Sequence, residues 1–353
     1  MNEYGKVIGF IVAVLLVYLL FWPTPVDPIA YTPPEKPEME GVLAPNDELL
    51  KAELIARGEI NGPEDVVIDS QDRIYGGTQD GKIVRILTGG SIETFADTGG
   101  RPLGLAFDKD ENLIVADAYK GLLSIDPSGK IMVLSIETDG VPYKFTDHLD
   151  IASDGKIYFT DASFKYQQNE YLYDLLESRP NGRFLRYDPE TRGTEVLLKD
   201  LYFPNGVALS QNEEFVLVNE TYRYRILRYW LTGPKADTAE VFVDNLPGFP
   251  DNITSNRRGT FWLALFTVRN DIMDKMHPYP FLKKVISRLP SFLWPKPEPY
   301  GFVLAIDENG EIIRSLQDPS GTHLKEITGA REHEGYLYLG SLHNDRIGKY
   351  PLE

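Results

Sequence analysis

The stretch NGVALSQNEEFVLVNE, residues 205–220, contains the pattern that decides the fold. Small or polar residues alternate with apolar ones at its start, a polar turn follows, and a second apolar run leads to residue 220. This pattern is typical of two antiparallel strands that are joined by a turn. Five more stretches of the chain repeat it, starting at residues 64, 103, 147, 251 and 325. Such internal repetition indicates a repeat architecture.

Each repeat continues with a third strand and usually a fourth, as in GRFLRYD at 182–188 followed by TEVLLK at 194–199. Six units of four antiparallel strands predict an all-β fold, a six-bladed β-propeller. The sixth unit ends after its third strand, at residues 346–353. Residues 51–55 have the pattern of the missing fourth strand, so we expect them to complete the last blade and close the ring.

Composition limits the functions that the chain can have. Its 353 residues, 42% of them hydrophobic, are enough for one large domain. The formal net charge of -17 argues against a nucleic-acid partner, since phosphate binding needs clustered Lys and Arg. The absence of Cys excludes a disulfide scaffold, a cysteine-based zinc site and a thiol nucleophile. An acidic chain of this kind is better suited to binding cations.

Residues 7–22, VIGFIVAVLLVYLLFW, form an uncharged apolar run near the N-terminus. We expect residues 1–22 to be a signal-anchor transmembrane helix with a short cytoplasmic tail, which makes the lipid bilayer a partner. A cleaved signal peptide is the alternative, but PTPVDP follows the run in place of a cleavage site with small residues. Lys6 precedes the run and acidic residues follow it, which predicts that the rest of the chain is non-cytoplasmic, either periplasmic or lumenal/extracellular.

The next segment, residues 23–47, is rich in proline. Proline at this density disfavours helix and central strand, and it is typical of a stiff, extended spacer. We therefore expect a Pro-rich linker that lifts a propeller domain, residues 48–353, away from the membrane.

Equivalent positions in the repeats form a ring in a propeller, and the position before each inner strand lies at the mouth of the central channel. From the first unit to the sixth it is occupied by Glu64, Leu103, Asp147, Asn205, Asp251 and Lys325. Three carboxylates that converge on one axis repel each other unless a counterion is present. We expect one divalent cation there, Ca²⁺ ahead of Mg²⁺ and other metals, because Ca²⁺ accepts six to eight oxygen ligands. Asn252 could add a further ligand.

Two other interpretations of these residues remain open. Asp and Asn are common in turns and at strand ends, so each residue taken alone could have a purely structural role. Lys325 could also neutralise the ring in place of a metal ion.

A resemblance to a known family is carried by FTDHLDIASDGKIYFTDAS at 145–163, GRFLRYDPETRGTEVLLKDLYFPNGVALS at 182–210 and YRILRYWLTGPKADTAEVFVDNLPGFPDNI at 224–253. These stretches resemble the strictosidine synthase-like family, and within it the adipocyte plasma membrane-associated protein branch. The wider superfamily includes paraoxonases, gluconolactonases and diisopropyl-fluorophosphatase. Its members are six-bladed propellers with a catalytic Ca²⁺ that hydrolyse lactones, aryl esters or phosphotriesters, which implies the same fold and metal here.

The resemblance also implies a ligand set. The metal motif of the superfamily corresponds to Glu64, Asn205 and Asp251, with Asn252 following as in paraoxonases. The remaining ligand is usually Asn, and this chain has Asp147 in its place. That replacement keeps an oxygen donor and adds a negative charge.

Two positions differ from the superfamily in ways that affect the chemistry. Where paraoxonases have a histidine that is proposed as general base, this chain has Leu103. Where true strictosidine synthases have their catalytic glutamate, it has Lys325, so Pictet-Spengler chemistry is not expected. His148 and His323 lie next to ring positions; a lone histidine there is more often a supporting group, and His148 is kept as a candidate base.

These observations together predict a membrane-anchored, calcium-dependent hydrolase of small-molecule esters or lactones, similar to arylesterases and lactonases. A carboxylate of the ring, Asp251 ahead of the others, would activate water or attack the substrate. The competing hypothesis is a non-catalytic, membrane-tethered binding propeller with a structural calcium, since the propeller fold serves many functions.

Two long insertions, residues 163–182 and 267–300, are expected to determine specificity. The second contains FLKKVISRL at 281–289, in which helical spacing separates an apolar arc from an arc that contains Lys283, Lys284 and Arg288. One interpretation is a helix whose apolar arc packs on the propeller. The other is a lid whose basic arc touches anionic lipid, which makes residues 281–294 a second predicted contact with the bilayer.

Overall fold

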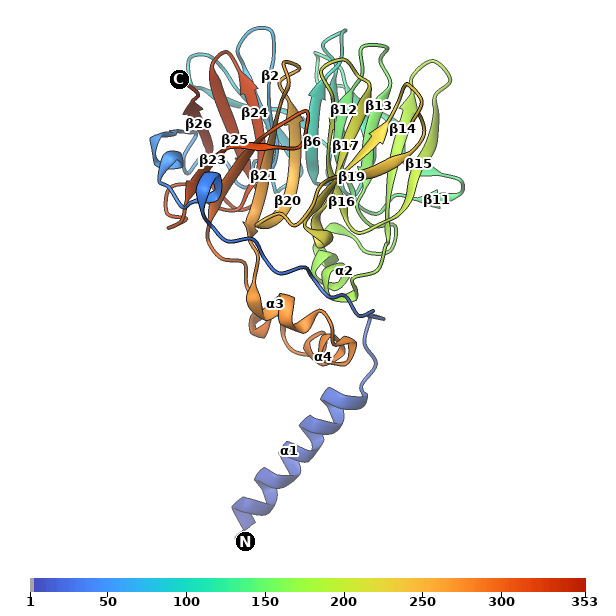
Figure 1. Ribbon diagram of the computed structural model, residues 1–353, viewed down its shortest axis with the longest axis vertical. Helices are drawn as coiled ribbons and strands as arrows, with labels where there is room; N and C mark the ends of the chain where they lie inside the picture. Colours follow the sequence, from blue (N-terminus) through green and yellow to red (C-terminus); the bar gives the residue numbers. More distant parts are fainter. Residues whose placement is uncertain (1–2) are drawn as a thin grey trace.

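Six four-stranded antiparallel sheets are arranged in a ring in the computed structural model of the protein, which describes residues 3–353 (Figure 1). The predicted six-bladed β-propeller is therefore confirmed. In each blade the inner strand comes first in the chain and the following strands lie progressively outward, except in the last blade.

Blade 1 contains β2 (Val66–Ile68), β3 (Ile74–Gly77), β4 (Lys82–Ile86) and β5 (Ile92–Asp97). Blade 2 contains β6 (Pro102–Phe107), β7 (Leu113–Asp117), β8 (Gly121–Ile125) and β9 (Ile131–Ser135). Blade 3 contains β12 (Thr146–Ile151), β13 (Ile157–Asp161), β14 (Gly182–Asp188) and β15 (Gly193–Leu201). Blade 4 contains β16 (Pro204–Leu209), β17 (Phe215–Glu220), β18 (Arg225–Trp230) and β19 (Ala239–Val243).

Blade 5 contains β20 (Gly248–Ser255), β21 (Thr260–Val268), β22 (Gly301–Asp307) and β23 (Ile312–Asp318). Blade 6 contains β24 (Ile327–His333), β25 (Tyr336–Ser341), β26 (Ile347–Pro351) and β1 (Glu53–Ile55). A small hairpin of β10 (Glu137–Thr138) and β11 (Val141–Pro142) lies between blades 2 and 3 in the chain.

The ring is closed by the N-terminal strand, as the sequence predicts. β1 pairs with β26 in antiparallel register, with Leu54 opposite Gly348. The turn before β1 is anchored by Leu49, which is fully buried in an apolar cluster shared with blade 6. β1 thus supplies the fourth strand of blade 6 and ties the start of the domain to its last blade.

Close packing of the inner strands positions the residues at the centre. Gly206 follows the ring residue Asn205, and a Cβ atom at Gly206 would lie 2.4 Å from the backbone nitrogen of Ile253 in blade 5. Gly329 has the same position in blade 6, where a Cβ would lie 3.0 Å from the backbone oxygen of Glu64. Without a side chain at these points, the inner strands come close enough for their ring residues to converge.

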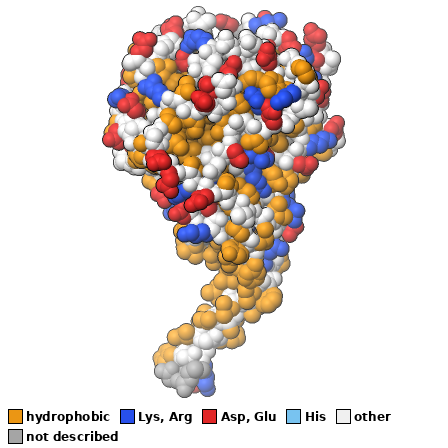
Figure 2. Space-filling model, in the orientation of Figure 1, with side chains coloured by type: hydrophobic (Ala, Val, Ile, Leu, Met, Phe, Trp, Pro, Cys, Tyr) orange, Lys and Arg blue, Asp and Glu red, His pale blue; other side chains and the backbone are white. Residues whose placement is uncertain are grey.

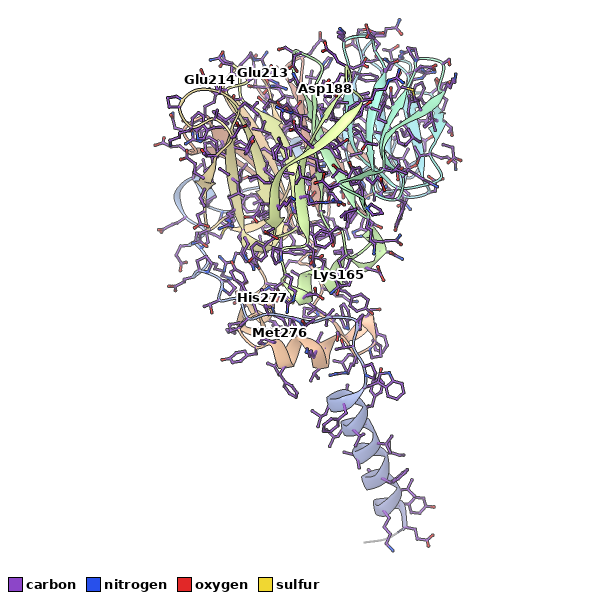
Figure 3. The ribbon with its side chains drawn as sticks, turned by 90° about the vertical axis from the view of Figure 1, so that its right-hand side faces the viewer. Lys165, Asp188, Glu213, Glu214, Met276 and His277 are labelled. Atoms are coloured by element: carbon purple, nitrogen blue, oxygen red, sulfur yellow. The ribbon has the colours of Figure 1, made fainter. Side chains whose placement is uncertain are left out.

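The α-helices lie at one end of the ring, whereas two short helical turns before β1 lie at its flank (Figure 1). The helices at this end are α2 (Tyr171–Glu177), α3 (Asp271–Met276), α4 (Pro280–Ile286) and the short 3-10 helices η3 (Gln168–Glu170), η4 (Thr221–Arg223) and η5 (Ser291–Leu293); η1 (Gly41–Leu43) and η2 (Glu48–Lys51) precede β1. The long helix α1 (Glu3–Phe21) extends away from this end. The loops with Glu213, Glu214 and Asp188 lie at the opposite end (Figure 3).

The Pro-rich segment is extended, as expected, but it packs against the domain. The backbone nitrogen of Ile29 donates to the carbonyl of Glu177 at 3.1 Å, and that of Tyr31 to His277 at 3.1 Å. Arg269 donates to the carbonyl of Pro34 at 2.6 Å. We call residues 23–36 the docked strap. Several of its backbone groups, which form no helix or sheet, bond to the domain, so this part of the predicted spacer is docked on the domain.

Candidate metal centre

A cavity of about 120 Å³ lies where the central channel opens toward the helices. Its polar lining includes four of the predicted ring residues, Glu64, Asp147, Asn205 and Asp251, all of them buried. Leu103 also lines it, as the repeat register predicts. The structure therefore brings these five side chains together from blades 1 to 5.

The apolar walls come largely from aromatic side chains and from the two insertions. The aromatic residues are Phe145, Phe203, Tyr222, Phe249 and Phe266. The first insertion contributes Tyr171, Leu172 and Leu175 of α2, and the second contributes Asn270 and Met273 at α3 together with residues 295–297. A few polar groups on the floor of an apolar cleft are the usual arrangement of a small-molecule site.

Three of the four polar ring residues are held through their backbone by a side chain of a neighbouring blade. Thr160 donates to the carbonyl of Asn205 at 2.6 Å, and Thr328 donates to the carbonyl of Glu64 at 2.7 Å. The amide of Asn219 donates to the carbonyl of Asp251. These bonds fix the ring backbone and leave the side-chain oxygens free to face the cavity, which pre-organises them for a ligand.

Several of these oxygens have no hydrogen-bond donor within residues 3–353. They are Oε2 of Glu64, Oδ1 of Asn205, Oδ1 of Asp251 and Oδ1 of Asn252. Asn252 is fully buried, and its amide nitrogen donates to Oε1 of Glu64 at 3.1 Å. Buried oxygens without donors are costly, and an oxygen-binding cation would satisfy several of them at once.

The electrostatics of the ring also fit a cation. Burial and the neighbouring Asp251 raise the pKa of Glu64 well above its ordinary value. Burial and the charge of Glu64 raise the pKa of Asp147, while burial and Asp147 raise that of Asp251. Each carboxylate thus disfavours the charged form of the next, and a divalent cation would remove this repulsion.

One ring position differs from the sequence prediction. In blade 6 the cavity is lined by Thr328, whereas we expected Lys325. The chain turns before β24, which begins at Ile327, with Glu326 in the left-handed region at φ 49°, and the cavity-lining position lies three residues later than the repeat alignment suggested. Lys325 is therefore not the counter-charge of the ring, and neither residue is the glutamate of true strictosidine synthases.

Arg101 is a charged residue near the ring that the sequence did not indicate. It is buried and donates to the carbonyls of Gly62 at 3.0 Å and Gly77 at 3.3 Å. Its positive charge partly opposes the rise in the pKa of Glu64. However, these side-chain hydrogen bonds go to backbone carbonyls and not to a ring carboxylate, so Arg101 offsets the ring charge only from a distance.

His148, in β12 of blade 3, lies outside the cavity lining and contacts residues of blades 1 and 4. Its Nδ1 accepts a hydrogen bond from the backbone nitrogen of Val207 at 3.1 Å, and its Nε2 is 3.7 Å from a carboxylate oxygen of Asp65. Burial lowers the pKa of His148 to about 4, so its imidazole is neutral at pH 7. The structure thus places His148 behind Asp147 and away from the cavity lining, and its role as a base stays a prediction.

The chain is similar in sequence to proteins of one known family. A family model described as strictosidine synthase matches residues 147–234, and one described as strictosidine synthase-like, N-terminal, matches residues 41–86. An adipocyte plasma membrane-associated protein from Rattus norvegicus is 39% identical over 363 residues, covering 96% of each chain. The chain belongs to the strictosidine synthase-like family.

Solved structures show how widely this strictosidine synthase-like fold is shared. A gluconolactonase from Xanthomonas campestris has a TM-score of 0.63 at 17% identity, covering 94% of this chain and 99% of its own. Regucalcin from Agrobacterium tumefaciens, described as a calcium-binding protein, has a TM-score of 0.59 at 13% identity, covering 84% and 90%. At such identities the likeness concerns the fold alone.

Proposed function

We propose that this protein is a membrane-anchored, calcium-dependent hydrolase of small-molecule carboxylic esters or lactones. The observation that carries the proposal is the set of donor-free, buried oxygens of Glu64, Asn205 and Asp251 on the floor of an apolar cavity. Glu64, Asp147, Asn205 and Asp251 would hold the ion. When bound, Ca²⁺ would supply polarisation of a carbonyl oxygen and stabilisation of the developing negative charge.

The side chains of the cavity would perform the remaining tasks. The aromatic walls, including Phe145 and Phe249, would bind the apolar part of an ester or lactone and exclude water from it. Asp251 is the most exposed of the three ring carboxylates, which makes it the most accessible to a water molecule or a substrate carbon. We assign to it the role of base or nucleophile.

The comparisons give this proposal limited support. The strictosidine synthase-like family includes a rat relative named for the plasma membrane, and the fold is shared with a gluconolactonase and with a calcium-binding protein. The anchor would be α1, which is long and apolar enough to cross a membrane by length and composition. The propeller would lie on the non-cytoplasmic side.

The test is a metal analysis of the purified chain, followed by activity on phenyl acetate and a panel of lactones. Turnover that EDTA abolishes and Ca²⁺ restores would support the proposal, with Asp251→Asn inactive under both conditions. Tight calcium binding without turnover of any ester or lactone would instead indicate the non-catalytic binding propeller. If the chain binds no divalent metal at all, the metal centre itself is wrong.

A further inference from the structure

Helix α4 exposes two of its large apolar side chains and buries a lysine. Phe281 and Leu282 are 57% and 45% exposed, whereas Lys283 is 0% exposed. This is the reverse of the usual distribution, in which Lys is almost never fully buried and large apolar side chains face the core. The apolar arc of this helix is therefore divided: Ile286 packs against the cluster of Leu176, Met273 and Met276, whereas Phe281 and Leu282 face outward.

The basic side chains of α4 make contacts within this chain. Lys283 donates to the carbonyl of Ile29 in the docked strap at 2.9 Å and to Oγ of Ser178 at 2.8 Å. Lys284 lies 3.5 Å from a carboxylate oxygen of Asp27. Contact between this basic arc and anionic lipid stays a prediction, and the structure places part of the arc in contacts within the chain.

Arg288, which follows α4, fixes this region to the end of α1. Its guanidinium donates to the carbonyls of Leu19 at 2.9 Å and Trp22 at 2.6 Å, which belong to the otherwise unsatisfied carbonyls at a helix C-terminus. The hydroxyl of Tyr18 donates in turn to the carbonyl of Arg288 at 3.1 Å. The position of α4 is thus tied to the last turn of α1.

The exposed apolar surface continues beyond α4. In η5, Phe292 and Leu293 are 71% and 56% exposed. We define Phe281, Leu282, Phe292 and Leu293 as the base patch. Figure 2 shows hydrophobic side chains that continue from α1 onto the narrow end of the domain, whereas charged side chains are frequent at the wide end. Large exposed apolar side chains gathered in one region indicate an interaction surface.

We propose that the base patch inserts into the interfacial layer of the same bilayer that α1 crosses. A 19-residue helix spans roughly 28 Å, close to the hydrocarbon thickness, so its last turn lies at the membrane surface. The base patch is fixed beside that turn, and aromatic side chains are enriched at this depth. The occupant is therefore lipid, bound through apolar contact and not through the basic residues.

The inference rests on the membrane anchor of the proposed function but is independent of hydrolysis. The full chain has no Cys, so single cysteines can be introduced and labelled with an environment-sensitive fluorophore. Phe281→Cys and Phe292→Cys test the base patch, and Leu15→Cys in α1 tests the anchor. The exposed Glu214→Cys, at the opposite end of the ring, is the control (Figure 3). Each variant is reconstituted in phosphatidylcholine vesicles with and without brominated acyl chains.

We expect brominated lipid to quench the labels at positions 15, 281 and 292, and to leave the label at position 214 unchanged. Quenching at position 15 alone would overturn the inference and leave the anchor intact. A label at 281 or 292 that is shielded from water but not quenched by lipid would point to a protein partner and would also overturn it. If the label at position 15 is not quenched either, both the membrane anchor and the insertion of the base patch are contradicted.

Discussion

At the scale of single residues, the carboxylates of the ring connect stability with function. Burial and the charge of Asp251 disfavour the ionised form of Glu64. One side-chain oxygen of each residue has no hydrogen-bond donor within the described chain. Groups of this kind are retained at a cost to the fold, which is common at functional sites. The same groups should therefore have opposite effects on stability with and without a bound cation.

The substitution Glu64→Gln tests this directly. In EDTA we expect the variant to unfold at the same temperature as the parent or higher, because one source of carboxylate repulsion is removed. With calcium we expect it to gain much less stability than the parent. A ligand at one hundred times its Kd adds about 2.7 kcal/mol, and most of that increment should be lost. Thermal unfolding in EDTA and in calcium measures both effects.

The matched control is Glu214→Gln, the same chemical change at an exposed position at the other end of the ring. It should leave the calcium increment unchanged. An increment in Glu64→Gln equal to that of the parent would show that Glu64 is not a ligand.

At the scale of elements, the short segment before the first blade is part of the last one. Leu49 in η2 is 0% exposed and packs in the cluster that includes Leu324, Leu339 and Tyr350. Its neighbour Leu50 is 46% exposed. The two leucines therefore offer the same substitution in two environments, one residue apart.

We expect Leu49→Ala to destabilise the protein by about 2 to 5 kcal/mol, because it leaves a cavity in a close-packed cluster. Leu50→Ala should change stability by less than about 0.5 kcal/mol. Denaturant unfolding of both variants in the same detergent gives the comparison. Equal stabilities would mean that the N-terminal segment contributes little to closure of the ring.

The sequence predicted the blades well because alternating apolar strands repeat with a shared turn pattern. It placed Asp147, Asn205 and Asp251 at the cavity for the same reason. It misplaced the sixth ring residue because the turn at Glu326 shifts the strand, and a repeat alignment carries no information on backbone dihedral angles. The docked strap and the buried position of Lys283 in α4 depend on contacts between distant segments, such as Lys283 with Ile29. No local sequence pattern contains such contacts.

At the scale of the whole molecule, three features lie at one end of the propeller. The cavity opens toward α2 and α3, the anchor leaves from the same end, and the base patch lies beside the anchor. Residues 295–297 line the cavity and are separated from Leu293 of the base patch by a single residue, Trp294. If the base patch inserts into the bilayer, a substrate dissolved in the bilayer surface would have a short path to the cavity and its ring carboxylates.

This arrangement makes the orientation of α1 decisive for which compartment supplies the substrate. Lys6 and the terminal amine precede the apolar run, and Asp27, Glu35 and Glu38 follow it, so the positive flank should remain in the cytoplasm. A reporter fused after Glu353 should therefore be active only on the non-cytoplasmic side. Lys6→Glu should increase the fraction of chains in the opposite orientation, because it removes the only side-chain cation before the run. A cytoplasmic signal from the unmodified chain would reverse the assignment, and the cavity would then have to be supplied from the cytoplasmic leaflet.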